Sequence, residues 1–280
     1  MAPDTFSLTG KTAIVTGSGR ENGIGAAIAH TLARNGARVV INHVSDSSAP
    51  RAAKVAAGIQ SIGADAIVVQ ADVSTPEGAA KLANETLKGF NADRIDILGT
   101  TTPSIQFPER SVNNAGGGTA QGVSIFDVSA AEVERGFAAN TYSTLYTVQA
   151  VAPHMPRGGR IVNIGSVVSR VRNAPGLAVY GASKAAQEYL TGAMSYELGT
   201  TKGITVNTVA PGPVGDTDAN GWYPDGDMKT DVGAKLAVGA KLGRVAGEVD
   251  EIADAVLLVV SEQGRWLTGQ YIAASGGITE

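Results

Sequence analysis

The sequence predicts a single α/β domain, residues 1–280, with a doubly wound parallel sheet covered by helices on both faces. Short runs of β-branched residues alternate with longer alanine-rich stretches along the chain, and this alternation is typical of parallel strands joined by right-handed helical crossovers. The strand-like runs lack polar alternation, as strands do when helices cover both faces. No composition break marks a linker, and 280 residues suit one domain of this class.

The expected elements follow one another in a regular order. β-Branched residues favour strands, whereas alanine and other straight-chain residues favour helices. On this basis we expect strands at Thr12–Thr16, Arg38–Asn42, Asp65–Gln70, Arg160–Ile164, Ile204–Val209 and Tyr271–Ala273. The stretches between them are expected to form helices at Gly23–Asn35, Ser48–Ile62, Pro76–Gly89, Ala130–Ala152, Val179–Gly199 and Glu248–Ser261.

The composition excludes several classes of function. Hydrophobic residues make up 43% of the chain, enough for a large core, and the net charge of −4 comes with no basic stripe, so nucleic acid is not an expected partner. The absence of cysteine excludes disulfides and thiolate catalysis, and His30, His43 and His154 are too scattered to predict a metal site. Neither a membrane span nor a signal peptide is evident, so we expect a cytoplasmic protein without membrane partners.

A glycine-rich turn joins the first expected strand to the first expected helix. It contains Gly17, Gly23 and Gly25. Glycines at such a junction let the backbone approach a pyrophosphate, which binds at the N–H groups and positive dipole of the helix start. A lone glycine fingerprint is often a turn without a ligand, but its place at the first strand–helix junction favours a dinucleotide site of the Rossmann type.

The end of the second strand indicates which dinucleotide binds. Sheets that bind NAD usually have an acidic residue there for the ribose 2′-hydroxyl, whereas this chain has His43. A 2′-phosphate therefore meets no carboxylate at that position, and Arg20, Ser45 and Ser47 are close to it in the expected fold. Asp46, in the same turn, argues the other way. We therefore expect NADP(H) rather than NAD(H).

Tyr180 and Lys184 stand four residues apart in an expected helix. Positions i and i+4 share one helix face, so the lysine ammonium lies beside a phenol whose ordinary pKa is about 10. A nearby cation favours the phenolate, and such a tyrosine can exchange protons near neutral pH. An isolated pair with this spacing usually arises by chance on an amphipathic helix, so the pair gains its meaning from the other motifs.

Short motifs in a fixed order extend these observations over nearly the whole chain. They are Thr16-Gly17 with Gly23-Ile24-Gly25, Asp72-Val73, Asn113-Asn114-Ala115-Gly116, Asn140, Ser166, Tyr180 with Lys184, Pro211-Gly212, Thr268-Gly269-Gln270 and Gly276-Gly277. With these residues the chain resembles the classical short-chain dehydrogenases/reductases. The resemblance implies hydride transfer between NADP(H) and a small carbonyl or alcohol substrate, in a homodimer or homotetramer.

The resemblance also implies a role for each matching residue. Tyr180 would be the general acid in reduction and the base in oxidation, and Ser166 would hydrogen-bond the substrate oxygen. Lys184 would bind the nicotinamide ribose and lower the pKa of the tyrosine, while Asn140 would hold a water that links this lysine to solvent. The implied cofactor-binding residues are Gly17, Ser18, Arg20, Gly23, Ile24, Gly25, His43, Ser45, Asp72, Val73, Asn114, Ala115, Gly116, Tyr180, Lys184, Pro211, Gly212 and Val214.

Two of these residues also have ordinary structural interpretations. Taken alone, Ser166 is a turn or helix-cap hydroxyl, and Asp72 is a cap for the helix that begins near Pro76. Only the joint pattern with the tyrosine and lysine favours the functional interpretation.

The glycine turn departs from the family pattern. Five residues separate Gly17 from Gly23, whereas the family usually has three. The longer gap resembles the enoyl-thioester reductases of the same superfamily, but those enzymes space their catalytic tyrosine and lysine more widely. The three-residue gap between Tyr180 and Lys184 therefore favours carbonyl chemistry over enoyl reduction.

A second departure interrupts the expected fourth strand. Ile95–Leu98 is followed by a polar segment, Gly99–Ser111, before the motif that begins at Val112. A central strand cannot contain such an insertion without losing backbone hydrogen bonds. Either one half forms the strand and the rest loops out at its N-terminal end, or the segment is a translated intron or similar gene-model error. We expect it to be displaced from the sheet or absent from the active protein.

Residues 213–244 are expected to form a lid over cofactor and substrate, with a helix at Thr230–Lys241. Trp222, Tyr223 and Met228 either offer an apolar wall to an aromatic or alicyclic ketone or simply pack the lid onto the body. The expected function is an NADP-dependent ketone reductase or alcohol dehydrogenase. Two rivals are a protein of this fold with non-redox or multistep biosynthetic chemistry and a catalytically silent NADP-binding protein.

Overall fold

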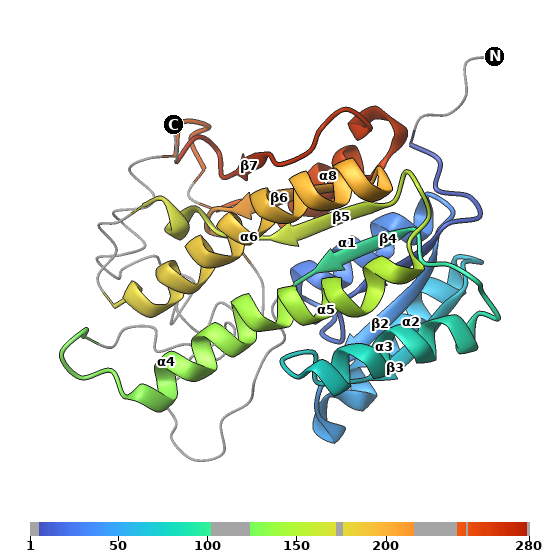
Figure 1. Cartoon of the computed structure of the whole chain (residues 1–280), viewed down its shortest axis with the longest axis horizontal. Helices are drawn as coiled ribbons and strands as arrows, with labels where there is room; N and C mark the ends of the chain where they lie inside the picture. Colours follow the sequence, from blue (N-terminus) through green and yellow to red (C-terminus); the bar gives the residue numbers. More distant parts are fainter. Residues whose placement is uncertain (1–5, 102–123, 172–175, 216–239, 245, 279–280) are drawn as a thin grey trace.

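The computed structural model describes residues 6–101, 124–171, 176–215, 240–244 and 246–278. These residues contain one parallel sheet in the strand order β3-β2-β1-β4-β5-β6-β7 (Figure 1). The strands are β1 (Thr12–Val15), β2 (Arg38–His43), β3 (Ala66–Gln70), β4 (Ile97–Thr100), β5 (Arg160–Ile164), β6 (Thr205–Pro211) and β7 (Tyr271–Ala274). This order confirms the doubly wound sheet that the sequence predicts.

Helices connect the strands, and the six helices expected between the predicted strands are present within the described residues. They are α1 (Ile24–Arg34), α2 (Ala49–Ser61), α3 (Pro76–Gly89), α4 (Ala130–Phe137), α5 (Ser143–Val151), α6 (Ala178–Lys202) and α8 (Val249–Val260), with short turns η1 (Asp46–Ser48), η2 (Ala138–Tyr142), η3 (Ala152–His154), η4 (Val167–Ser169) and η7 (Glu262–Gly264). One expected helix differs from the prediction, because η2, a single turn of π-helix, divides Ala130–Ala152 into α4 and α5. The predicted helix Thr230–Lys241 falls mostly outside the described residues.

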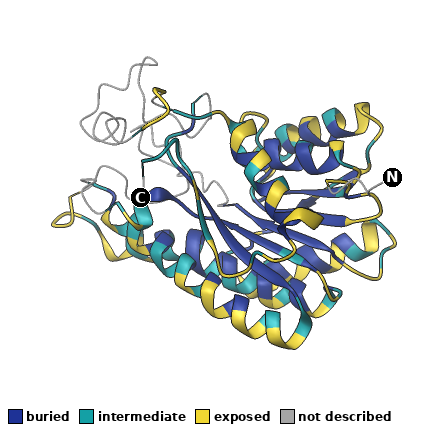
Figure 2. Ribbon diagram, turned by 90° about the horizontal axis from the view of Figure 1, so that it is seen from above, coloured by how far each residue is buried: buried dark blue, intermediate teal, exposed yellow. Residues whose placement is uncertain are grey.

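Two apolar layers hold the helices against the sheet. On one face, α1, α2 and α8 pack around Ile28 and Val256. On the other face, α3, α5 and α6 pack around Leu82 and Val151 (Figure 1). The strands between them are buried along most of their length, while the outer helix surfaces are exposed (Figure 2). Burial on both faces explains why the strand sequences lack polar alternation.

The fourth strand corrects the sequence prediction. β4 comprises Ile97–Thr100, so Gly99 and Thr100, which we expected outside the sheet, complete it. Gly99 pairs with Val15 of β1, and Thr100 pairs with Asn163 of β5. Thr100 Oγ1 also donates to Asn163 Oδ1 at 2.7 Å. Ladder pairing uses backbone groups, so the first residues of the segment complete the strand. Thr101 is bound to the end of β1 through its N–H, which donates to Thr16 Oγ1 at 2.9 Å, and the segment from residue 102 onward lies outside the described residues.

The strand order places one edge of the sheet where ligands bind in this class of fold. β1 lies between β2 and β4. The sheet grows from β1 through β2 to β3 on one side and through β4 to β7 on the other. In doubly wound sheets, ligands bind outside the carboxyl ends of the strands at such a switch point. Within the described ranges, no helix has both the length and the apolar character that a membrane span needs.

Candidate active site

The glycine-rich turn lies between the carboxyl end of β1 and the start of α1. Gly17 has a φ of +59°, a backbone conformation that favours glycine. Gly25 has no room for a side chain, because a Cβ there would lie 2.8 Å from the carbonyl oxygen of Gly17. Gly23 is the N-cap of α1 and makes no side-chain cap. The first backbone N–H groups of α1, which begins at Ile24, therefore have no side-chain cap and can bind a ligand.

A buried asparagine that the sequence analysis did not single out fixes this turn. Asn42 of β2 accepts from the N–H of Gly17 at 3.2 Å and donates to the carbonyl oxygen of Ala71 at 3.0 Å. Ser18 donates to the carbonyl oxygen of Val15 at 2.7 Å and accepts from the N–H of Asn42 at 3.1 Å. These contacts tie the turn to the ends of β2 and β3, so its shape is set by the fold itself.

A pocket beside the turn combines two arginines with several hydroxyl groups. Its lining residues are Gly17, Gly19, Arg20, Asn42, His43, Val44, Ser45, Ser47, Ser48 and Arg51. Guanidinium and hydroxyl donors around one pocket suit a phosphate ester. The residues present therefore fit the 2′-phosphate of NADP. Arg51 is an addition to the predicted residues, since only the packing of α2 beside the turn brings it there.

Two carboxylates near this pocket have defined partners. Glu21, one of the extra residues of the long glycine turn, accepts from Arg51 Nε at 2.5 Å. Asp46, which argued against NADP in the sequence, instead accepts from Gln70 Nε2 at 2.8 Å and does not line the pocket. His43 Nδ1 lies 3.1 Å from the carbonyl oxygen of Ser45, so its ring is part of the pocket wall.

The fold brings Ser166, which follows β5, together with Tyr180 in the first turn of α6. Ser166 caps η4, where its Oγ accepts from the N–H of Val168 at 3.3 Å. Its hydroxyl also shares a hydrogen bond with the Tyr180 phenol. The cap interpretation of this serine is therefore confirmed, and its contact with the substrate oxygen stays a prediction. Burial raises the pKa of Tyr180, and the hydrogen bond to Ser166 offsets part of the rise.

Lys184 is buried on the same helix, with 2% of its surface exposed. Its Nζ donates to the carbonyl oxygen of Ile164 at 2.7 Å and to Gln187 Oε1 at 3.1 Å. Burial lowers the pKa of Lys184 from 10.5 to about 7, because a low-dielectric environment disfavours the charged amine.

The causes of the Tyr180 shift are burial and Ser166, so the lowering of the Tyr180 pKa by Lys184 stays a prediction. The pKa of the tyrosine is raised rather than lowered. Burial is the largest cause for both groups. The helical spacing predicted where the two residues lie but gave no measure of how deeply the fold buries them.

Asn140 lies in the π-helical turn η2 and is fully buried. Its Nδ2 donates to the carbonyl oxygen of Gly136 at 3.1 Å and to Ser183 Oγ at 3.0 Å. Ser183 Oγ in turn donates to the carbonyl oxygen of Tyr180 at 2.8 Å. Single π-turns frequently mark functional sites. The turn joins Asn140 to the first turn of α6, and the water contact implied for Asn140 stays a prediction.

The other predicted cofactor residues with described positions lie at the carboxyl edge of the sheet. Asp72 and Val73 follow β3, and Pro211 ends β6. Gly212 donates its N–H to the carbonyl oxygen of Ala274 at 3.1 Å, and Val214 forms a β-bridge.

Asp72 has a local contact that differs from the helix cap considered for it. Asp72 does not cap α3, because Thr75 is the N-cap, and Asp72 accepts from the N–H of Ser74. The predicted residues Asn114, Ala115 and Gly116, and the lid residues Trp222, Tyr223 and Met228, lie outside the described residues. Across the described part of the chain, no group of three or more His, Cys, Asp or Glu side chains is placed to hold a metal ion.

Comparison with known proteins identifies the family. Residues 17–279 match the family model described as enoyl-(acyl carrier protein) reductase. Versicolorin reductase 1 of Aspergillus parasiticus is 36% identical over 281 residues, which cover 98% of each chain. Tetrahydroxynaphthalene reductase of Pyricularia oryzae is 31% identical over 285 residues, 99% of this chain and 92% of that protein.

A solved structure agrees with these relatives. The angucycline C-6 ketoreductase LanV with bound NADP matches 97% of this chain and 96% of its own, with a TM-score of 0.80 and 34% identity. The chain therefore belongs to the short-chain dehydrogenases/reductases, as its motifs predict. It is an oxidoreductase.

Proposed function

We propose that this protein reduces the carbonyl group of a ketone with NADPH. The observation that carries the proposal is the hydrogen bond between the Tyr180 phenol and Ser166 at the carboxyl end of β5. It lies at the sheet edge that also carries the glycine turn and the two-arginine pocket. Relatives are named as reductases of versicolorin and tetrahydroxynaphthalene, and a structural neighbour as a ketoreductase with bound NADP, which supports the same reaction class.

In the proposed mechanism, the hydride for the carbonyl carbon is the chemistry that NADPH would supply when bound. Ser166 donates a hydrogen bond to the carbonyl oxygen and holds it beside Tyr180. Tyr180 gives its proton to that oxygen as negative charge develops there. Its raised pKa keeps the phenol protonated at neutral pH, as a proton donor needs. Lys184 binds the nicotinamide ribose. Asn140, in the π-helical turn η2, supports the first turn of α6 through its hydrogen bond to Ser183.

The same proposal assigns the two-arginine pocket to the 2′-phosphate of NADPH. Arg20 and Arg51 supply guanidinium donors, and Ser45 and Ser47 supply hydroxyls. The preference for NADPH over NADH follows from these groups, because an unphosphorylated ribose makes no use of the two positive charges.

We further propose a hydroxylated aromatic ketone as the substrate. The support is the name tetrahydroxynaphthalene reductase, which describes a fused aromatic ring system with several hydroxyl groups. Of the two alternatives given for Trp222, Tyr223 and Met228, the apolar wall would suit such a substrate.

A second candidate is reduction of an enoyl thioester. The description of the matching family model and the long glycine turn favour it. The three-residue gap between Tyr180 and Lys184, both on α6, favours the ketone. Activity on a ketone panel and on a crotonyl thioester, followed by loss of NADPH absorbance, distinguishes the two.

The test of the main proposal uses the same assay with a hydroxylated naphthalenone and simple aliphatic ketones. Turnover of a ketone that Tyr180→Phe lowers by roughly 100-fold or more, with NADPH binding retained, is the expected result. Tight NADPH binding without turnover of any carbonyl compound would instead support the silent or non-redox rivals.

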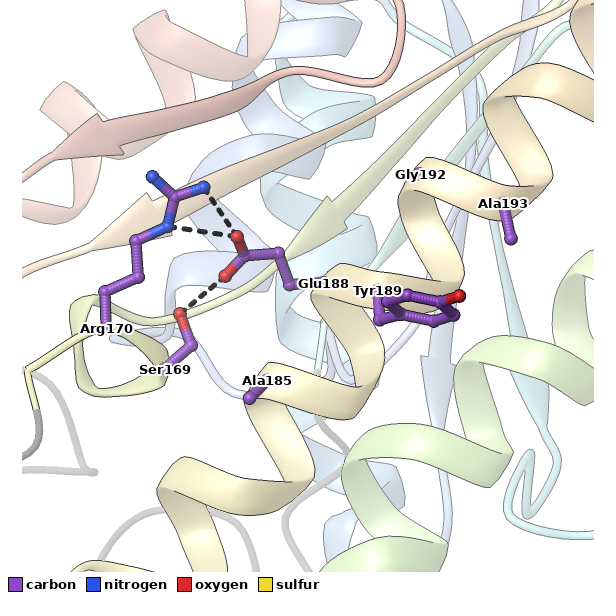
Figure 3. A pocket seen from close by; sticks show the side chains of 7 residues that line it. All are labelled: Ser169, Arg170, Ala185, Glu188, Tyr189, Gly192 and Ala193. Carbon is purple, nitrogen blue, oxygen red and sulfur yellow. Dashed lines mark hydrogen bonds and ion pairs between the residues drawn. The ribbon is translucent and has the colours of Figure 1, made fainter.

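The outer face of α6 supports assembly into a homodimer or homotetramer. Small residues, Ala185, Gly192 and Ala193, line a shallow pocket there beside Tyr189, which is 80% exposed (Figure 3). Small side chains let a second helix approach closely. A Cβ at Gly192 would meet nothing within 4 Å in this chain, so Gly192→Trp should leave the fold intact and give monomers by analytical ultracentrifugation. The cytoplasmic location stays a prediction, testable by cell fractionation.

A further inference from the structure

Gln187 is a buried amide that contacts Lys184 and that the motifs do not explain. It lies one turn after the lysine on α6 and is 2% exposed. Its Oε1 accepts from Lys184 Nζ at 3.1 Å, and its Nε2 donates to Thr144 Oγ1 of α5 at 2.7 Å. Thr144 Oγ1 donates to the carbonyl oxygen of Asn140 at 3.0 Å. A chain of hydrogen bonds therefore runs from the lysine through Gln187 to the π-helical turn.

The chemistry of the three groups fixes the direction of this chain. An ammonium group only donates, so the amide must present its oxygen to Lys184. The hydroxyl proton of Thr144 is used in its bond to Asn140, so this hydroxyl accepts from the amide NH₂. A flipped amide would place two donors against the ammonium and lose both contacts. The Gln187 amide thus has one orientation. One N–H of the Lys184 ammonium points toward its oxygen, one turn later on α6.

Among the described contacts of Lys184, Gln187 is the side chain that accepts a hydrogen bond from its amine. β5 contributes the uncharged carbonyl oxygen of Ile164. Asn140 of η2 donates to Ser183 Oγ, and Tyr180 lies one turn earlier than Lys184 on α6. Glu188, the nearest carboxylate in sequence, accepts from side chains of η4 and its following residue instead (Figure 3). A hydrogen bond to a charged group favours that charged form.

We propose that Gln187 is a positioning residue for Lys184, which holds one ammonium proton and keeps the amine charged over the pH range in which NADPH binds. This role rests on the proposed function, in which Lys184 holds the nicotinamide ribose. Gln187 itself touches neither substrate nor cofactor. It acts through the lysine, and its removal changes the pH at which the lysine loses its proton.

The experiment measures the NADPH dissociation constant by protein fluorescence from pH 6 to pH 9. In the wild type, affinity should fall as pH rises through the deprotonation of Lys184. Gln187→Leu removes the acceptor and should move the midpoint of this fall to lower pH by roughly one unit, the worth of one charge-assisted hydrogen bond. Gln187→Glu places a carboxylate beside the amine and should move the midpoint to higher pH. The alkaline limb of kcat/KM with a ketone should move in the same directions.

Thr191→Val is the matched control. Thr191 is also buried on α6, where its Oγ1 accepts from Asn163 Nδ2 at 2.8 Å, and it does not contact Lys184. The variant should lower stability without moving the midpoint. Gln187→Met replaces the leucine variant if that variant does not fold, and it should show the same shift.

Equal midpoints in the wild type and in the Gln187 variants would overturn the inference and assign Gln187 a packing role only. Shifts of the leucine and glutamate variants in the same direction would do so as well. Failure of the wild type to bind NADPH at any pH is a different outcome, because it would overturn the proposed function and, with it, the role given to Gln187.

Discussion

Lys184 is expected to destabilise the fold, and replacing it with methionine tests this expectation. Burial lowers its pKa from 10.5 to about 7. The unfolded chain therefore binds a proton that the folded chain has lost between these two pH values. Stability rises with pH wherever the unfolded state binds more protons. Above about pH 10.5 the titration of Lys184 therefore does not lower the unfolding free energy, and below about pH 7 it lowers this free energy by its full amount.

The magnitude follows from the two pKa values. One pKa unit corresponds to about 1.4 kcal/mol, so the shift amounts to roughly 5 kcal/mol at low pH. Integration over the folded-state titration gives a change of about 2 kcal/mol between pH 7 and pH 9. Methionine has a similar length and no charge. It leaves the carbonyl oxygen of Ile164 without its lysine donor, a cost that does not depend on pH. The pH dependence is therefore more informative than the absolute stability.

The assay is urea unfolding of wild type and Lys184→Met at pH 6, 7, 8 and 9, at one protein concentration. The unfolding free energy of the variant minus that of the wild type should be largest at pH 6 to 7 and fall by about 2 kcal/mol at pH 9. Lys202→Met is the control, because Lys202 lies at the end of the same helix, donates to a backbone carbonyl and keeps contact with solvent. A difference that stays constant or grows with pH would refute the reasoning.

Three further variants test the cofactor edge. Arg20→Ala should weaken NADPH binding by roughly 10-fold or more and leave NADH binding little changed, because it removes a charge-assisted contact to the 2′-phosphate; equal losses in titrations with the two cofactors would contradict this. Gly25→Ala should weaken both cofactors, since its Cβ would lie 2.8 Å from the carbonyl oxygen of Gly17; unchanged affinity in the same titrations would show that the turn adapts. Asn42→Leu should lower the unfolding free energy by roughly 2–4 kcal/mol, because Gly17 and Ala71 lose buried partners; a loss below 1 kcal/mol in urea unfolding would count against the proposed clamp.

Local sequence patterns predicted the elements of this fold well because each pattern reflects a local cause. Pro76 at the first position of α3 marks the predicted helix start through backbone geometry, whereas α6 continues past the predicted Gly199 and ends at Lys202, before Gly203 with its positive φ. The glycine turn was also predictable from a local pattern, because its glycines lie within one short stretch of the sequence. The resemblance implies that Ser166 and Tyr180 act together, and the fold places the serine within hydrogen-bonding reach of the tyrosine.

The features that the sequence did not predict depend on contacts between distant elements. Arg51 reaches the two-arginine pocket only because α2 packs beside the glycine turn. Asn42 can hydrogen-bond both Gly17 and Ala71 because β2 lies between β1 and β3. Gly99 and Thr100 complete β4 because β1 and β5 offer backbone partners on both sides, and a family pattern of side chains contains no information on that pairing.

The directions of the Tyr180 and Lys184 pKa shifts lead to a prediction for the pH dependence of the proposed reaction. A tyrosine acidified by a lysine would be a good base, suited to removing a proton from an alcohol. A tyrosine whose pKa is raised by burial keeps its proton at neutral pH and is suited to giving it to a developing alkoxide. If Lys184 binds the nicotinamide ribose as proposed, cofactor binding should weaken as the pH rises above about 7, because the lysine then loses its charge. Both effects act in the same sense, so ketone reduction should be fastest on the acidic side of neutrality and alcohol oxidation should need a higher pH.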